Sequence, residues 1–192
     1  NVNRTPNLEM IIAYISSDKN ERTHRHHGRK NIPLELVEKT FKLLPQADKD
    51  IVVRYTAEYI RTHYFKNLEF KTQMYKFAIL FGSDKDWGHI NQFLESLLIG
   101  SINLDFLTAL CKKIFIVMDE EFSLENISPH IAGACLALIT EIGGRVKLEC
   151  EKSNGLSKSK FTLFIEFLTS NMLARSNINN ETMRIGLIYY FS

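Results

Sequence analysis

The sequence predicts an all-α protein, and three observations lead to this prediction. Along most of the chain, apolar residues recur at intervals of three and four, which places them on one face of a helix. Prolines and glycines stand where such runs begin and end. No run of β-branched residues alternates with polar residues between turn signals, as a half-buried strand would. The length of 192 residues, with 45% hydrophobic and 24% charged residues, suits a single all-α domain over residues 1–192.

Two consecutive apolar helices within residues 101–144 are expected to organise the fold. The first carries one broad apolar stripe, formed by Leu104, Leu107, Leu110, Cys111, Ile114, Phe115 and Met118. The second, over residues 131–142, is apolar nearly all the way round, which is typical of a helix covered on several sides. Ser128-Pro129 provides its start signal and Gly143-Gly144 its stop signal. We expect the rest of the chain to cover this pair.

Further helices are predicted from the same signals, which gives roughly nine in all. They cover residues 7–17, 34–44, 47–65, 68–81, 87–99, 161–173 and 181–191. Helical hairpins begin near Leu34, Leu68 and Ile102, a period of roughly 35 residues that is typical of helix-pair repeats. We expect either stacked hairpins of the HEAT or armadillo kind or a compact helical bundle. Residues 17–31 and 152–160 are polar and are expected to be solvated loops.

The cysteines and the hydropathy of the chain bear on its compartment. Cys111, Cys135 and Cys150 are odd in number and match no metal-binding spacing, so we expect reduced thiols that pack as small hydrophobes. Reduced thiols favour an intracellular location, cytoplasmic or nuclear. No apolar run reaches the roughly 18 residues of a membrane-spanning helix, so we expect no membrane partner. Because the sequence begins with Asn1 and closes on an apolar run over residues 185–191, we expect a piece of a longer protein.

A basic segment within residues 17–31 holds the candidate binding residues. They are the four cations Arg22, Arg25, Arg29 and Lys30. Arginine and lysine pair with phosphate oxygens and with carboxylates, so a phosphate or an acidic partner is the expected ligand. The histidines between them, His24, His26 and His27, do not predict a metal site, because the neighbouring cations repel a metal ion. The alternative interpretation is a solvated loop without a ligand.

The sequence contains no catalytic motif: it lacks the GxSxG, HExxH, P-loop and GxGxxG patterns. The acidic run at residues 119–121 is expected to be a linker that solvates a helix end. We therefore expect no enzymatic activity, no cofactor and no metal. The all-α pattern and the hairpin spacing favour a non-catalytic scaffold or adaptor that binds another protein through a groove between helices.

Nucleic-acid binding is the alternative function, with the basic residues 22–30, Lys158 and Lys160 on phosphates. The net charge of +2 leaves this alternative open without favouring it. Tyrosines that share a helix with cations are able to stack on bases when they are exposed, although packing is their commoner use. The tyrosines concerned are Tyr55, Tyr59, Tyr64 and Tyr75, in helices that also carry Arg54, Arg61, Lys66 and Lys76.

Three segments are similar to the motifs of one known family. They lie at residues 8–15, 43–48 and 86–90, with Phe93 and Leu94 after the last. The last, Asp-Trp-Gly-His-Ile, resembles the Trp-Gly-Arg-Ile segment of Bcl-2-like apoptosis regulators, and the others resemble the family's first amphipathic helix and its Leu-x-x-x-Gly-Asp motif. The resemblance implies a regulator that binds a helical peptide. His89 replaces the arginine that pairs with the ligand, Pro45 falls inside the second motif and Trp87 is the only tryptophan, so no binding residue is transferred.

Overall fold

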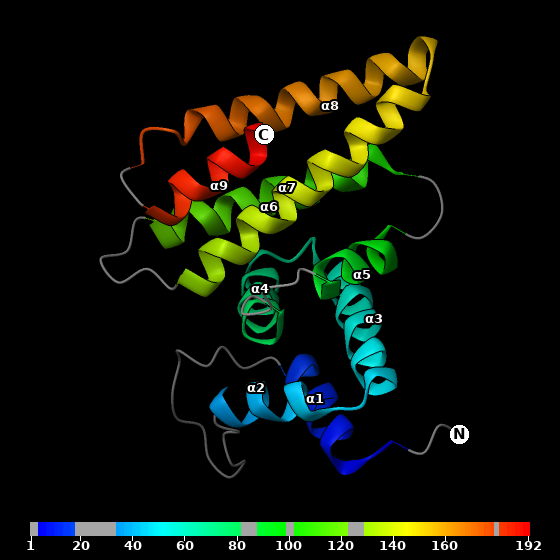
Figure 1. The fold of residues 1–192 in the computed structure, drawn as a ribbon, viewed down its shortest axis with the longest axis vertical. Coiled ribbons are helices and arrows are strands. Elements are labelled where there is room, and N and C mark those ends of the chain that lie inside the picture. Colours follow the sequence, from blue (N-terminus) through cyan, green and yellow to red (C-terminus); the bar gives the residue numbers. More distant parts are fainter. Residues whose placement is uncertain (1–3, 18–33, 82–87, 99–101, 123–128, 179–180) are drawn as a thin grey trace. The chain divides into compact units, whose positions relative to one another are not determined.

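The computed structural model describes residues 4–17, 34–81, 88–98, 102–122, 129–178 and 181–192. Every regular element in these ranges is an α-helix, which confirms the predicted all-α class (Figure 1). The helices cluster into two compact units, residues 1–97 and residues 98–192, and the single domain expected over residues 1–192 stays a prediction. Each unit buries apolar side chains from its own helices, so each has a core. The further expectation of HEAT-like stacked hairpins stays a prediction.

Five helices form the described part of the first unit. They are α1 (Pro6–Ser16), α2 (Leu34–Leu43), α3 (Gln46–His63), α4 (Asn67–Phe81) and α5 (Gly88–Leu97). α1 contacts α2 and α3, both of which contact α4, and α5 packs along α3. The rings of Phe41, Phe77, Phe81 and Phe93 lie in tilted and edge-on pairs with centroids 4.7 to 5.4 Å apart. Because these rings come from α2, α4 and α5, they join helices that are distant in sequence.

Polar contacts fix the C-terminal end of α1. The side-chain amide of Gln73 on α4 donates to the carbonyl oxygen of Ile15 at 3.1 Å. The Lys76 ammonium donates to the same oxygen at 3.3 Å, to the Ser17 hydroxyl at 3.0 Å and to the Ser17 carbonyl oxygen. The sequence places Lys76 among the cations beside tyrosines, but the structure buries it. Its ammonium complements the partial negative charge of a helix C-terminus.

Four helices form the described part of the second unit. They are α6 (Leu104–Phe122), α7 (Pro129–Lys152), α8 (Gly155–Ala174) and α9 (Glu181–Phe191). α7 contacts each of the other three helices, and α6 also contacts α8. The predicted apolar pair, α6 and α7, therefore organises this unit, whereas the first unit is built on its own core.

An ion pair joins the ends of α6 and α8. The Arg175 guanidinium donates to both carboxylate oxygens of Asp119, at 2.8 and 2.7 Å, and lies 4.4 Å from the ring centroid of Phe115. The prediction that residues 119–121 form a solvated linker is therefore wrong. These residues belong to α6, where Asp119 binds Arg175 and Glu121 is buried.

The predicted end of α7 at Gly143-Gly144 is also wrong, because the helix continues to Lys152. Gly143 is buried inside the helix, and a Cβ atom at this position would lie 3.2 Å from Cε2 of Tyr190 on α9. The absence of a side chain lets α9 approach α7 closely. Glycine at this position therefore serves helix packing, not helix termination.

The predicted loop at residues 152–160 is largely helical. Gly155 begins α8 with a φ of +60°, a left-handed conformation that favours glycine, and the helix continues through this polar segment. Residues 154–160 are all exposed. The polar composition therefore reflects an exposed helix end. The other predicted loop, residues 17–31, lies outside the described residues apart from Ser17.

Candidate functional site

The four predicted binding residues, Arg22, Arg25, Arg29 and Lys30, lie outside the described residues. Their role stays a prediction. The tyrosines named with the nucleic-acid alternative all lie within the described residues and are half-buried, and two of them join α3 to α1. The Tyr55 hydroxyl lies 2.5 Å from the Ser16 hydroxyl, and the Tyr59 hydroxyl donates to the Ser16 carbonyl oxygen at 3.5 Å. Within α3, the Tyr59 ring stacks on His63 with centroids 4.1 Å apart. Stacking on His63 occupies one face of the Tyr59 ring.

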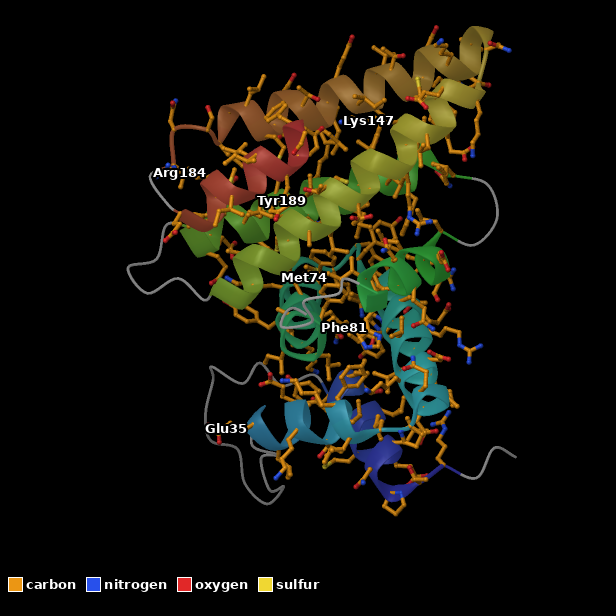
Figure 2. All side chains as sticks on the ribbon, viewed as in Figure 1. Glu35, Met74, Phe81, Lys147, Arg184 and Tyr189 are labelled. Atoms are coloured by element: carbon orange, nitrogen blue, oxygen red, sulfur yellow. The ribbon has the colours of Figure 1, made fainter. Side chains whose placement is uncertain are left out.

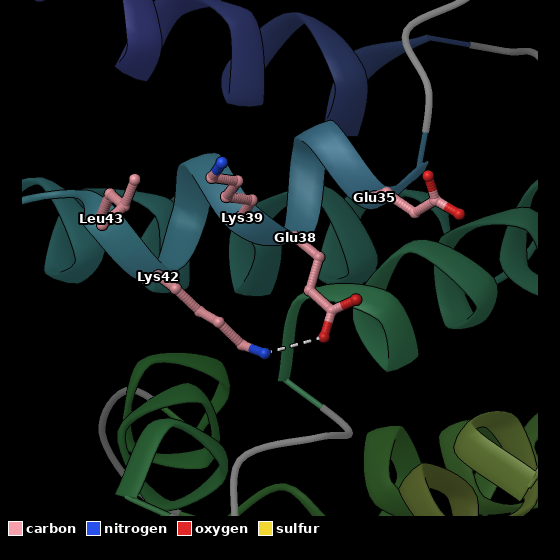
Figure 3. Close-up of a pocket in the computed structure, with 5 residues that line it drawn as sticks. All are labelled: Glu35, Glu38, Lys39, Lys42 and Leu43. Carbon is pink, nitrogen blue, oxygen red and sulfur yellow. Dashed lines mark hydrogen bonds and ion pairs between the residues drawn. The ribbon is translucent and has the colours of Figure 1, made fainter.

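A hollow of about 400 Å³ lies beside α2 (Figure 3). Its described lining consists of Glu35, Glu38, Lys39, Lys42 and Leu43. The Lys42 ammonium pairs with the Glu38 carboxylate at 2.9 Å, and both side chains remain open to solvent. The acidic and basic charges of this lining balance, and every described lining residue comes from one helix. Such a wall does not gather the converging, buried groups on which a catalytic site depends.

The cysteines serve packing in two of three cases. Cys111 and Cys135 are buried, and burial raises the pKa of each thiol far above its usual range. The nearby Glu121 carboxylate raises the pKa of Cys135 further. Both thiols therefore stay protonated and unreactive in the folded state. Cys150 is half-buried, 3.6 Å from the Thr162 hydroxyl. Among the described residues, no three histidine, cysteine or acidic side chains are grouped as metal ligands.

The inner face of α9 packs tightly on α7. Met183, Gly186 and Tyr190 are buried at helical spacing. A Cβ atom on Gly186 would lie 2.5 Å from Cδ1 of Leu136, a distance that real Cβ contacts do not reach. The Tyr190 hydroxyl lies 3.2 Å from the Thr169 hydroxyl of α8, and burial raises the pKa of Tyr190. This face of α9 is thus fixed between α7 and α8.

The outer face of α9 is apolar and exposed. It consists of Ile185, Ile188 and Tyr189, which are 48%, 68% and 68% exposed. We call these three residues the α9 face. Their spacing of three and four residues places them in one stripe on the side opposite the buried residues. Exposed apolar residues scattered singly are ordinary, whereas a contiguous stripe indicates an interaction surface.

One cation lies beside the α9 face, and a second lies against a residue of the buried inner side of α9. Arg184 precedes Ile185, and the Lys147 ammonium of α7 lies 5.1 Å from the ring centroid of Tyr190, the residue after Tyr189 (Figure 2). Both side chains are exposed, and neither forms an ion pair with a described residue. The α9 face is therefore apolar, with the exposed Arg184 beside it.

The sequence held a signal for the α9 face. Residues 185–191 are apolar apart from Gly186, so this helix is apolar on more than one side. A helix that is apolar all round is normally covered all round. The apolar composition of residues 185–191 does not show which side of the helix stays exposed, because the side that α7 covers depends on the tertiary packing.

The chain matches no family model, no curated protein and no solved structure. The likeness to Bcl-2-like regulators therefore stays a prediction from three short segments. In the described helices, none has both the length and the apolarity to cross a lipid bilayer.

Proposed function

We propose that this chain is a non-catalytic interaction module that binds another protein through the apolar surface of its helices. The single observation that carries the proposal is the α9 face, an exposed stripe on a helix whose other side is fixed by close packing. Burying a large aliphatic or aromatic side chain contributes roughly 1.5–3 kcal/mol. A partner that covers Ile188 and its neighbours gains from this term without any rearrangement of α9.

The test compares two variants that each place a glutamate at an exposed aliphatic residue, one on the α9 face and one on another helix. Ile188 is 68% exposed on α9, and Leu163 is 64% exposed on α8. We expect Ile188→Glu to abolish recovery of a partner from source-cell lysate, because a charge in the buried centre of an interface is costly. Leu163→Glu, the matched control, should retain the partner. Circular dichroism checks that both variants fold.

Two results would contradict the proposal. Equal recovery by the wild type and by Ile188→Glu would show that the α9 face does not bind the partner. Recovery that vanishes after nuclease treatment would favour the nucleic-acid alternative and the basic residues 22–30. A partner that resists nuclease and is lost with Ile188→Glu supports the proposal.

A further inference from the structure

The connection between α7 and α8 contains the only Asn-Gly pair of the sequence. Ser153 and Asn154 form this connection, and Gly155 is the first residue of α8 (Figure 1). Asparagine before glycine is a chemically reactive pair. The backbone nitrogen of the second residue reaches the side-chain amide carbon of the first, because glycine has no side chain that blocks the approach. The connection is therefore a candidate site of modification.

The side chain of Asn154 is not held by the fold. Asn154 is exposed and directly precedes α8, where an asparagine side chain usually accepts a hydrogen bond from the first turn of the helix. The Asn154 side chain forms no such bond, and among the described residues it has no other hydrogen-bond partner. Its amide carbon is therefore available for attack.

The backbone nitrogen of Gly155 is equally accessible. Its N–H is the first of α8, and the first N–H groups of a helix have no partner within that helix. No described backbone oxygen outside α8 accepts a hydrogen bond from it. A Cβ atom on Gly155 would have no neighbour within 4 Å, so the space beside the nitrogen is open. The φ of +60° favours glycine, which keeps this position without a side chain.

Ring closure between the two residues also needs movement of the backbone. Asn154 has an extended conformation, with a ψ of 162°, and it must rotate about this angle to bring its amide carbon to the Gly155 nitrogen. Residues 154–160 are all exposed, so no buried packing opposes the rotation. Ends of helices fray readily, which makes such a rotation accessible.

Asn103 occupies the same position at α6 and shows the opposite arrangement. It is also exposed, and it precedes Leu104, the first residue of α6. Its side-chain oxygen accepts a hydrogen bond from the Phe106 N–H at 3.1 Å, the usual contact of an asparagine that caps a helix. This hydrogen bond and the large side chain of Leu104 both oppose attack on Asn103. The chain therefore contains an internal control for Asn154.

From these observations we propose that Asn154 is a site of spontaneous deamidation in the folded chain. The Gly155 nitrogen attacks Cγ of Asn154 and closes a five-membered imide, while the bond between Cγ and Nδ2 breaks. Nδ2 takes up the proton of the Gly155 N–H and leaves as ammonia. A water molecule then opens the imide at one of its two carbonyl carbons. One opening gives aspartate, and the other gives isoaspartate, in which the main chain runs through the former side chain.

Both products change the beginning of α8. Each replaces a neutral amide by a carboxylate, and a negative charge at the start of a helix interacts favourably with the helix dipole. Isoaspartate also lengthens the main chain by one carbon atom between α7 and α8. The Cys150 thiol lies 3.6 Å from the Thr162 hydroxyl across this connection. We therefore expect the isoaspartate form to modify Cys150 faster with a maleimide than the unmodified chain does.

The experiment incubates the whole chain at neutral pH and follows it by peptide mapping with mass spectrometry. The peptide that contains Asn154 should gain one mass unit with time and separate into aspartate and isoaspartate forms, whereas the peptide that contains Asn103 should stay unchanged. In water enriched in the heavy isotope of oxygen, the product should gain two further mass units, because the new carboxylate takes one oxygen atom from water.

Two variants test the assignment to this pair of residues. Gly155→Ala places a methyl group beside the attacking nitrogen and should slow the gain of mass severalfold, whereas Gly144→Ala, at an exposed glycine of α7, should leave the rate unchanged. Asn154→Gln keeps the glycine, and its longer side chain would have to close a less favourable ring, so the gain of mass should disappear. Circular dichroism checks that each variant folds, and Asn154→Gln provides the test if the strained Gly155→Ala does not.

Two results would overturn the proposal. A folded chain that gains no mass at Asn154, while a synthetic peptide of residues 150–160 does, would show that the fold protects this residue. Equal gains at Asn103 and Asn154 would show that the connection between α7 and α8 has no special reactivity. Neither result bears on the α9 face, so this proposal and the proposed function stand or fall separately.

Discussion

The first and last described helices, α1 and α9, have the same length of 11 residues, and each packs one side against its own unit. Their outer sides differ. The outer side of α1 exposes Asn7, Glu9 and Ala13, whereas that of α9 exposes the α9 face. A helix with a polar outer side has little apolar surface left to bury once it has packed on its unit. A helix with an apolar outer side still has surface to bury, which is why α9 and not α1 supports a binding proposal.

The two helices are also held by different means. Hydrogen bonds from Gln73 and Lys76 hold the end of α1, while α9 is held by a close approach at Gly143 and Gly186. The position of α1 depends on side-chain hydrogen-bond donors, and the position of α9 depends on two glycines that have no side chain. Substitutions should therefore affect the two helices in different ways.

Among substitutions that remove a polar contact, the largest expected effect is at α1, where Lys76→Met removes an ammonium that donates to the carbonyl oxygens of Ile15 and Ser17. Leaving these buried groups without that donor should lower the free energy of unfolding by about 3 kcal/mol. Urea denaturation measures the change. Lys39→Met, on an exposed lysine of α2, is the matched control and should stay within about 0.5 kcal/mol of the wild type. Equal values for the two variants would show that Lys76 does not hold α1.

At α9, Gly186→Ala should lower the free energy of unfolding by about 2 kcal/mol, because the added methyl group meets Leu136 in a packed core. Gly144 provides the control, since a Cβ atom there has no neighbour within 4 Å and the residue is exposed within α7. Gly144→Ala should raise the free energy of unfolding by about 0.5–1 kcal/mol through helix propensity. A loss in both variants would contradict the close packing of α9.

A smaller effect concerns the pH dependence of the polar contacts in the first unit. Gln92 of α5 and Gln46 each donate to Asp50 of α3 at 2.9 Å, and these hydrogen bonds lower the pKa of the Asp50 carboxyl. A lowered pKa in the folded state stabilises the fold above the unfolded pKa of about 3.9. This stabilisation is lost as the pH falls through the folded pKa. The difference in unfolding free energy between the wild type and Asp50→Asn should therefore shrink between pH 6 and pH 3, and a constant difference would contradict the assignment.

The smallest effect on stability is expected on the α9 face itself. Ile188→Ser removes an exposed side chain and should change the free energy of unfolding by less than about 0.5 kcal/mol. The corresponding change on the inner side of α1, Ile11→Ser, replaces a fully buried side chain and should destabilise strongly. Thermal denaturation of the two variants makes the comparison. A large loss for Ile188→Ser would mean that the residue is part of the core.

The sequence predicted the helices more accurately than it predicted their ends and surfaces. The last helix is predicted at residues 181–191 and lies there. The prediction succeeds because the turn residues before Glu181 and the apolar residues after it are neighbours in the sequence. The predicted helix end at Gly143 is wrong because a glycine that ends a helix and a glycine that lets another helix approach have the same local sequence signal. Only Tyr190, far along the chain, distinguishes the two. The α9 face depends in the same way on which side of the helix α7 covers.

The cysteines described above give the second unit a reporter of its own. All three lie within residues 98–192, so thiol chemistry follows this half of the chain separately from the other. Cys150 is the first available to a maleimide reagent, while Cys111 and Cys135 react only when their surroundings open. The rate at which the two buried cysteines are modified after Cys150 therefore measures how often residues 98–192 open. The measurement requires no engineered probe.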